Sequence, residues 1–381
     1  MTAAFERERR LLDFAVASLA RRPTKNLGLT LVYALVVFLL GSVMLFGSAI
    51  RREAAALLAD APEIVAQRMV MGRHDLASAA DLEALNGLRG VRRVEPRLWG
   101  YLWDGAGAAT YTLMVPSPRD AARAVGPGEA IVGEGVARAR HLEVGKPFFL
   151  VSPAGKFLRT RVKAILPAAS ALASSDLVLI GEAAFRAFFE LPADRYTDFA
   201  IEVANPREVP TIAEKAAAKL PAYRFVTRAD MRRTDEALFS WREGLALALL
   251  ASSLLAFVIL AFDKASGLTA EEKREIGILK AIGWETSDVL RMKLWEGAVV
   301  SGTAFLVGLL AAWIHVFAFS AGLFEPVLKG WSTLFPKFAL SPEVDALEIA
   351  TLALLTIVPY AAAIMVPIWK TAVTDPDAVM R

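Results

Sequence analysis

The sequence contains no cysteine in 381 residues and only three histidines. The lack of cysteine excludes disulfide bonds, thiolate nucleophiles and cysteine-ligated metal sites. The histidines, His74, His141 and His315, are widely separated, and neither an H-E-x-x-H nor a G-x-S-x-G motif occurs. We therefore expect no catalytic residues and no metal site in this chain.

A phosphate-binding loop is also missing, because no segment matches G-x-x-x-x-G-K-[ST]. Gly155-Lys156 lacks the rest of that motif and falls in a predicted hairpin turn. Gly133-Glu134-Gly135 is too short for a dinucleotide fingerprint and is typical of a turn. We expect no cofactor bound by this chain. The net charge is only +3, and no basic run mixed with aromatic residues occurs outside the apolar segments' flanks, so nucleic acid is not an expected partner.

Apolar residues are in excess, at 55% of the chain, with a mean hydropathy of +0.44. The excess is concentrated in four windows without charge, 26–50, 244–262, 297–324 and 349–369. Each is near or above the roughly 20 residues that span a bilayer, so the sequence predicts four transmembrane helices. The first is longer than the ~7–15 apolar residues of a signal peptide and lacks its cleavage site, so we expect it to remain as an anchor.

The distribution of Lys and Arg predicts the orientation in the membrane. The first 25 residues and the loop 263–296 carry six basic residues each, whereas the loop 325–348 carries only Lys329 and Lys337. Both termini, including the tail 370–381, and the loop 263–296 are therefore predicted to be cytoplasmic. The segments 51–243 and 325–348 are predicted to be extracytoplasmic, as in a multi-pass protein of the inner cell membrane.

The leader 1–25 combines charged residues with an apolar stripe at helical spacing. Leu11, Phe14, Ala15, Ser18 and Leu19 form that stripe over residues 5–22. The pattern predicts an amphipathic helix that lies along the inner membrane surface, and a solvated basic leader is the alternative.

The segment 51–243 predicts an extracytoplasmic α/β domain. Two βαβ-like halves, about 51–127 and 167–243, flank a β-rich insert of about 128–166, and the first half contains an Asp104-Gly105 hairpin turn. Ser78 and Thr227 are predicted helix N-caps. Residues 51–61 and 228–243 lack helix breakers and predict stalk helices that extend the first and second spans.

Small residues recur at four-residue spacing in two of the predicted spans, a pattern that lets helices approach closely in lipid. We expect packing faces there, with ordinary lipid-facing alanines as the alternative. His315 in the third span could be a proton or ligand site, but a hydrogen bond between helices or a position close to the outer interface is the favoured interpretation. The packing-face residues are Ala248, Ser252, Ala256, Ala304, Gly308 and Ala312.

A short helix between the second and third spans has the most informative pattern in the chain. Thr269 and Glu272 form a capping box, and Gly283 followed by Trp284 predicts a glycine C-cap. Apolar residues cover most of the circumference of the second half of the helix, which predicts that this tip is buried against another surface. The residues predicted to make this contact are Arg274, Glu275, Ile276, Gly277, Ile278, Leu279, Lys280, Ala281, Ile282 and Gly283.

The motif REIGILKAIGW, with one span before a large external segment and three after it, resembles the FtsX/MacB-type permeases of ABC transporters. The arginine-rich leader and the DPDAVMR ending are similar to the same family. The resemblance implies a four-helix, type VII ABC permease with a MacB-like external domain, in a DevC-like or MacB-like branch.

The resemblance also implies a non-catalytic subunit and its partners. Two copies of a separate ATPase would bind ATP and Mg and dock on 274–283, with Ile276–Ile282 in a groove and Arg274, Glu275 and Lys280 pairing at its rim. Other implied partners are a second permease copy, membrane lipid and a periplasmic adaptor. The expected function is efflux or extrusion by mechanotransmission. The alternative is an FtsX-like complex that activates an envelope enzyme such as a peptidoglycan hydrolase.

Overall fold

The computed structural model describes residues 2–59, 61–167, 174–234, 270–326, 333–334 and 340–373, with isolated positions between 244 and 262. The chain divides into two compact units. The helical unit comprises Met1–Ala49, Ser240–Gly322 and Pro342–Arg381, and the α/β unit comprises Ile50–Phe239 and Leu323–Ser341.

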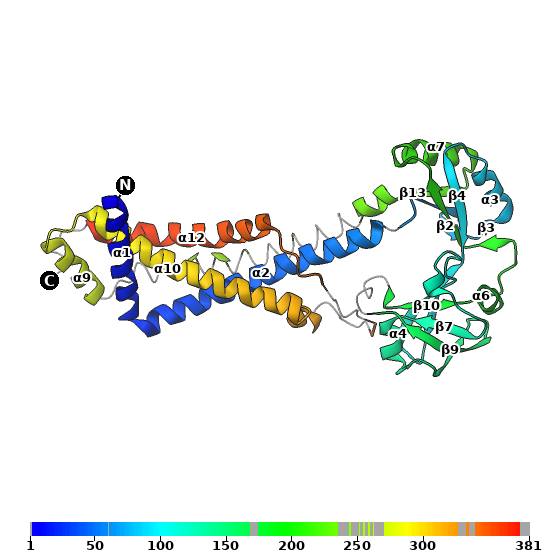
Figure 1. Ribbon diagram of the computed structural model, residues 1–381, viewed down its shortest axis with the longest axis horizontal. Helices are drawn as coiled ribbons and strands as arrows, with labels where there is room; N and C mark the ends of the chain where they lie inside the picture. Colours follow the sequence, from blue (N-terminus) through cyan, green and yellow to red (C-terminus); the bar gives the residue numbers. More distant parts are fainter. Residues whose placement is uncertain are drawn as a thin grey trace. The chain divides into compact units, whose positions relative to one another are not determined.

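The helical unit contains the long apolar helices (Figure 1). Its elements are α1 (Thr2–Ala20), α2 (Pro23–Ala59), α9 (Ala270–Ala281), α10 (Thr286–Trp313), a π-helical turn (Ile314–Ala318) and α12 (Ala346–Val373). In the part of the chain that is described, three helices are long and apolar enough to cross a membrane: Asn26–Ala59, Thr286–Ala318 and Ala346–Met365. Four spans were predicted, and the second, 244–262, lies largely outside the described residues.

The third apolar helix has different limits from the predicted 297–324. It begins at Thr286 and its helical part ends at Ala318. The early start reflects the charged first turns of α10, where Lys293 pairs with Glu296 at 2.6 Å. A charge-free window locates only the apolar part of a helix, because paired charges do not interrupt the backbone hydrogen bonds.

Small residues bring α2, α10 and α12 into close contact. A Cβ on Gly308 of α10 would lie 2.6 Å from the Ala34 carbonyl oxygen of α2, and a Cβ on Gly41 would lie 3.1 Å from Ala312 Cβ. Ala304 and Ala312 are fully buried. Gly308 and Ala312 therefore lie against α2 and Ala304 is buried in the same cluster, whereas Ala248, Ser252 and Ala256 lie outside the described residues.

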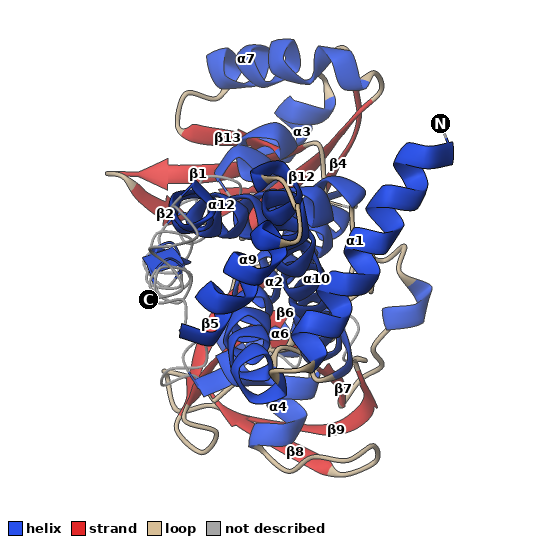
Figure 2. Ribbon diagram, turned by 90° about the vertical axis from the view of Figure 1, so that its left-hand side faces the viewer, coloured by secondary structure: helices blue, strands red, loops and turns tan. Residues whose placement is uncertain are grey.

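The α/β unit contains two main sheets, each with its own hydrophobic core. The first has the order β13-β1-β12-β4, with β2 paired to β1. Helices α3 and α7 pack beside it (Figure 2). The elements of this sheet are β1 (Ile64–Val70), β2 (Arg73–Asp75), α3 (Ala79–Asn86), β4 (Val91–Arg97), β12 (Asp198–Val203), α7 (Val209–Lys219) and β13 (Tyr223–Thr227).

The second sheet has the order β5-β6-β10-β7-β9-β8. Its elements are β5 (Trp99–Asp104), β6 (Ala109–Met114), β7 (Glu129–Val132), α4 (Glu134–Ala139), β8 (Pro147–Val151), β9 (Phe157–Ile165), β10 (Leu177–Ile180) and α6 (Glu182–Phe189). A two-stranded sheet pairs β3 (Ala77–Ser78) with β11 (Arg195–Tyr196), and short 3-10 turns lie at Ala121–Arg123, Pro206–Glu208 and Gly322–Phe324.

The second sheet is larger than the predicted insert of 128–166. Strand β6 pairs in parallel with β10, and β10 pairs with β7, so segments before and after the predicted insert join the same sheet. The predicted halves 51–127 and 167–243 are therefore each divided between the two sheets. Strand patterns in a sequence indicate where strands lie, but pairing depends on contacts between distant segments.

Local signals in this unit agree with the structure. Ser78 Oγ accepts a hydrogen bond from the Asp81 backbone N–H and caps α3, and Thr227 and Asp230 cap each other's backbone N–H groups. The hairpin from β5 to β6 turns at Asp104-Gly105, as predicted. Gly133 is the N-cap of α4 rather than part of a simple turn. A Cβ there would lie 1.8 Å from the Ser174 carbonyl oxygen, so the position requires glycine.

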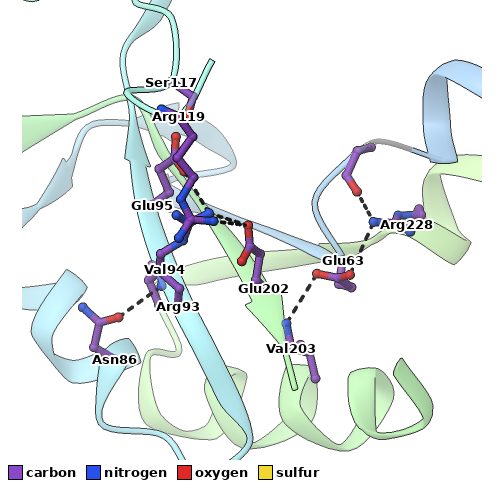
Figure 3. Close-up of polar contacts among 11 residues, drawn as sticks. Glu63, Asn86, Arg93, Val94, Glu95, Ser117, Arg119, Glu202, Val203 and Arg228 are labelled. Carbon is purple, nitrogen blue, oxygen red and sulfur yellow. Dashed lines mark hydrogen bonds and ion pairs between the residues drawn. The ribbon is translucent and has the colours of Figure 1, made fainter. Parts of the chain in front are cut away.

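The point where α2 leads into the first sheet is fixed by polar contacts (Figure 3). Arg228, directly after β13, donates to the Ala61 carbonyl oxygen and pairs with Glu63 at 3.5 Å. Glu63 also accepts from the Val203 backbone N–H of β12 at 3.4 Å. The residues that follow α2 are thus held to two strands of the sheet as well as to β1.

Candidate functional site

Helix α9 ends at the predicted glycine cap. Gly283 has a φ of +100°, and the Trp284 and Gly283 N–H groups donate to the Leu279 and Lys280 carbonyl oxygens, each at 3.0 Å. This is the pattern of a Schellman-type C-cap, in which glycine accepts the left-handed conformation without strain. The C-cap prediction is confirmed, whereas Thr269 of the predicted capping box lies outside the described residues.

The two faces of α9 differ in exposure. Ile276 and Leu279 are only 3% and 7% exposed, whereas Ile278 is 49% and Ile282 is 68% exposed. Arg274, Ala281 and Gly283 lie on the exposed side, Gly277 is buried, and Glu275 and Lys280 are half-buried. The exposed residues Arg274, Ile278, Ala281 and Ile282 recur at helical spacing and form one stripe, which we call the exposed stripe of α9.

The buried face of α9 is covered by the chain itself. Ile276 packs against Val289 of α10, and Leu279 joins a cluster with Leu11, Ala15 and Met292. The contact of this tip with a partner stays a prediction. Ile276 and Leu279 are explained by contacts within the chain, which leaves Ile278 and Ile282 as the large apolar side chains of α9 open to another molecule.

Helix α1 supplies part of this cover. Its apolar stripe, predicted to face the inner membrane surface, packs instead against α9 and α10. The ring centroids of Phe14 and Trp284 are 5.6 Å apart, and Ala15 is fully buried. Figure 1 shows α1 beside the first turns of α10. The sequence correctly predicted that α1 is an amphipathic helix, but the apolar face of this helix contacts α9 and α10.

Ion pairs surround this cluster. Glu275 of α9 accepts from Arg21 at 2.8 Å and from Arg22 at 3.4 Å. Glu8 of α1 accepts from Arg291 at 3.2 Å and from the Trp295 indole N–H at 2.8 Å. Glu275 was predicted to pair with a partner protein, but the structure places its carboxylate in contacts within the chain, since the two arginines lie next to it.

An open groove adjoins the exposed stripe. It has a volume of about 530 Å³ and lies between α1 and the cap of α9, lined by Arg7, Arg10, Leu11, Phe14, Gly283, Trp284 and Asp288. Arg7 pairs with Asp288 across it. The groove thus includes residues of α1, which the sequence did not place beside the cap of α9.

His315 lies in the π-helical turn after α10 and is buried. Its Nδ1 is 3.1 Å from Ser42 Oγ of α2, and Phe38 lies 5.4 Å away between ring centroids. The favoured interpretation, a hydrogen bond between helices, is confirmed. Among the described residues, no group of three or more His, Asp or Glu side chains is placed to hold a metal ion.

These features define a class of protein: a membrane protein with long apolar helices, an α/β unit outside the membrane, and a short helix that presents an apolar stripe. Residues 244–376 match the model of the FtsX-like permease C-terminal family. The resemblance carried by REIGILKAIGW is thereby confirmed.

Two solved structures are similar to part of the chain. The extracellular domain of the noncanonic ABC-type transporter YknZ from Gram-positive bacteria has 13% identity and a TM-score of 0.31, over 43% of this chain and 99% of that one. The periplasmic region of MacB from Actinobacillus actinomycetemcomitans has 10% identity and a TM-score of 0.32, over 45% and 92%. No curated protein matches the chain significantly.

Proposed function

We propose that this protein is the non-catalytic permease subunit of an ABC-type system. A separate ATPase binds the exposed stripe of α9, and its ATP-driven motion changes the arrangement of the external α/β unit. The observation that carries the proposal is the two-sided α9, with one face fixed to α1 and α10 and the other presenting Ile278 and Ile282. The match of residues 244–376 to FtsX-like permeases supports it, because that family implies a partner ATPase.

A fixed helix with an exposed apolar stripe suits transmission of force. A partner that covers Ile278 and Ile282 removes their side chains from water, and such apolar anchors dominate the energy of interfaces. Arg274, at one end of the stripe, and Lys280, beside it, suit a polar rim. Because the opposite face of α9 is packed on the chain itself, the partner's displacement moves the helix as a body.

The full assembly follows from the same proposal. Two permease chains, identical or different, pair with two ATPase copies, with the termini and α9 in the cytoplasm and the α/β unit outside. The proposed cytoplasmic parts are 1–25, 263–296 and 370–381, and ATP and Mg are bound by the ATPase alone. The membrane-spanning residues contact lipid and the second copy.

Efflux or extrusion from the outer leaflet or the periplasm by mechanotransmission is the favoured task. The support is the α/β unit, a large two-part body whose two sheets have separate cores. Activation of an envelope enzyme is the alternative task. Co-purification separates the two, since an adaptor accompanies the first and a hydrolase the second.

The docking proposal is tested with Ile278→Asp combined with Ile282→Asp. The ATPase encoded beside the gene is co-expressed with the full chain, and the complex is captured in detergent. Two charges in an apolar interface should cost at least about 2 kcal/mol, which weakens association tens of fold. Membrane insertion and thermal stability should not change, because both side chains are exposed.

Val16→Asp is the matched control. Val16 is 48% exposed, close to the 49% of Ile278, but lies on α1 away from the stripe. Unchanged capture of the ATPase by the Ile278 and Ile282 double variant would refute docking on this face. Loss of capture with Val16→Asp as well would show that any charge on the unit disturbs the complex.

A further inference from the structure

We infer that Arg21, Arg22 and Glu275 form a positioning link that transmits displacement of α9 to α2. The inference rests on the proposed function and goes beyond it, because it names a second route for the motion. The obvious route runs along the backbone from α9 through the Gly283 cap into α10. The link provides a route into a different helix, and that helix leads to the first sheet.

The geometry places Glu275 at the junction of α1 and α2. Both of its carboxylate oxygens are used, Oε1 by Arg21 at 2.8 Å and Oε2 by Arg22 at 3.4 Å. Arg22 directly precedes Pro23, the first residue of α2. A two-point contact fixes direction as well as distance, so a shift of α9 in the plane of the carboxylate pulls on the start of α2.

The junction itself is held by hydrogen bonds. The Asn26 side-chain amide of α2 donates to the Leu19 carbonyl oxygen of α1 at 2.9 Å, and the Asn26 backbone N–H donates to the Arg22 carbonyl oxygen at 3.3 Å. The last turn of α1 and the first turn of α2 therefore move together. Leu279, packed on Leu11 and Ala15, keeps α9 seated on α1 while the ion pairs direct the motion.

Helix α2 extends this route toward the α/β unit. It is one helix from Pro23 to Ala59. Beyond it, Ala61 and Glu63 are held by Arg228, and Glu63 also binds the backbone of Val203 (Figure 3). Strand β1 then begins at Ile64, between β13 and β12. The chain from Arg22 to Ile64 thus connects the α9 contact to the middle of a sheet.

The ion pairs contribute direction more than stability. The side chains of Arg22 and Glu275 are 25% and 24% exposed and that of Arg21 is 58% exposed, and partly exposed pairs of this kind contribute roughly 0–1 kcal/mol. Whether these ion pairs only stabilise the fold or also transmit motion, Glu275→Gln should therefore have nearly the same thermal stability as the unaltered chain. The two possibilities differ in what happens to ATPase activity.

The test uses the full chain with its ATPase in lipid nanodiscs, and measures both capture and the permease-dependent stimulation of ATP hydrolysis. With Glu275→Gln, capture should match the unaltered chain, while stimulation falls to the rate of the ATPase alone. Glu275→Asp should retain part of the stimulation, since it keeps the charge. Loss of capture would place Glu275 in the docking contact and overturn the inference, as would unchanged stimulation.

A covalent link provides the rescue experiment. The chain has no cysteine, so Arg21→Cys with Glu275→Cys gives a single reactive pair. Stimulation should be absent with free thiols and should return when a short bis-maleimide joins them. Glu6→Cys with Arg10→Cys is the matched control, because this exposed ion pair lies within α1.

Two outcomes remain distinct. If the cross-link fails to restore stimulation although capture is normal, the link is structural and the inference is wrong. If the unaltered chain captures no ATPase, the proposed function itself fails and the inference fails with it.

Discussion

Helix α10 makes two kinds of contact along its length. Its first turns meet α1 through ion pairs and a small mixed cluster, in which Arg291 and Trp295 hold Glu8. Its central part meets α2 through Gly308 and Ala312, whose neighbours there are the Ala34 backbone, Val37 and Gly41. The first contact is made by long side chains that can change rotamer, and the second by backbones that nearly touch.

The difference indicates where motion can be absorbed. Close-packed backbones have no space to slide, so α2 and α10 should keep their contact while the unit moves. The charged side chains between α1 and the first turns of α10 lie at a partly exposed surface and can shift by small amounts at little cost, which suits this contact to adjustment. The substitutions below test this division, beginning with the rigid contact.

Gly308→Leu should have the largest effect. Its Cβ would lie 2.6 Å from a backbone oxygen of α2 and 2.7 Å from Val37 Cβ, so the helices must separate. Overpacking of this kind costs about 3 kcal/mol. Thermal unfolding of the full chain in detergent measures it, with Gly302→Leu as the control on the same helix, where a Cβ meets nothing within 4 Å. Equal losses for both would show that α2 and α10 are not tightly packed.

Leu279→Ala should have a smaller and more local effect. The side chain is buried in a small cluster that can partly collapse, so we expect about 2 kcal/mol, the low end for this substitution. Hydrogen exchange of α1 and α9 should become faster. Ile278→Ala, one residue away on the exposed stripe, should change exchange little yet weaken ATPase capture. Faster exchange with Ile278→Ala than with Leu279→Ala would contradict the assignment of the buried and exposed faces.

How much the sequence could predict depended on distance along the chain. The Gly283 cap, the Ser78 and Thr227 caps and the Asp104-Gly105 hairpin were all predicted, because each is decided by residues a few positions apart. His315 was correctly assigned to a hydrogen bond between helices, but its partner, Ser42, was not predictable.

The faces of α9 were not predictable for a physical reason. Apolar residues cover most of its circumference, so periodicity could not separate Ile276 and Leu279 from Ile278 and Ile282. The separation depends on α1, which lies more than 250 positions earlier in the chain. The extent of the second sheet was missed in the same way, since β6 and β10 are joined only by long-range pairing.

The smallest expected effect concerns an ionic contact outside the membrane helices. Although burial raises the pKa of Asp81, hydrogen bonds from Tyr223 and Ser78 outweigh it and lower that pKa below its ordinary value. Tyr223 Oη donates to Asp81 at 2.7 Å and joins α3 to β13. A carboxylate with a lowered pKa stabilises the fold above its unfolded pKa, and this contribution disappears as the pH falls through the folded value.

Asp81→Asn should therefore destabilise the first sheet at neutral pH, and the difference from the unaltered chain should vanish in acid. Hydrogen exchange of α3 and β13, corrected for the intrinsic pH dependence, measures this difference. Tyr223→Phe should reduce the same pH dependence, because it removes the donor that favours the ionised form. The Gly308 contact contains no titratable group, so the loss caused by Gly308→Leu should be the same at both pH values. If the stability loss caused by Gly308→Leu changed with pH in parallel with the effect of Asp81→Asn, the α2–α10 contact and the Asp81 contact would not be independent.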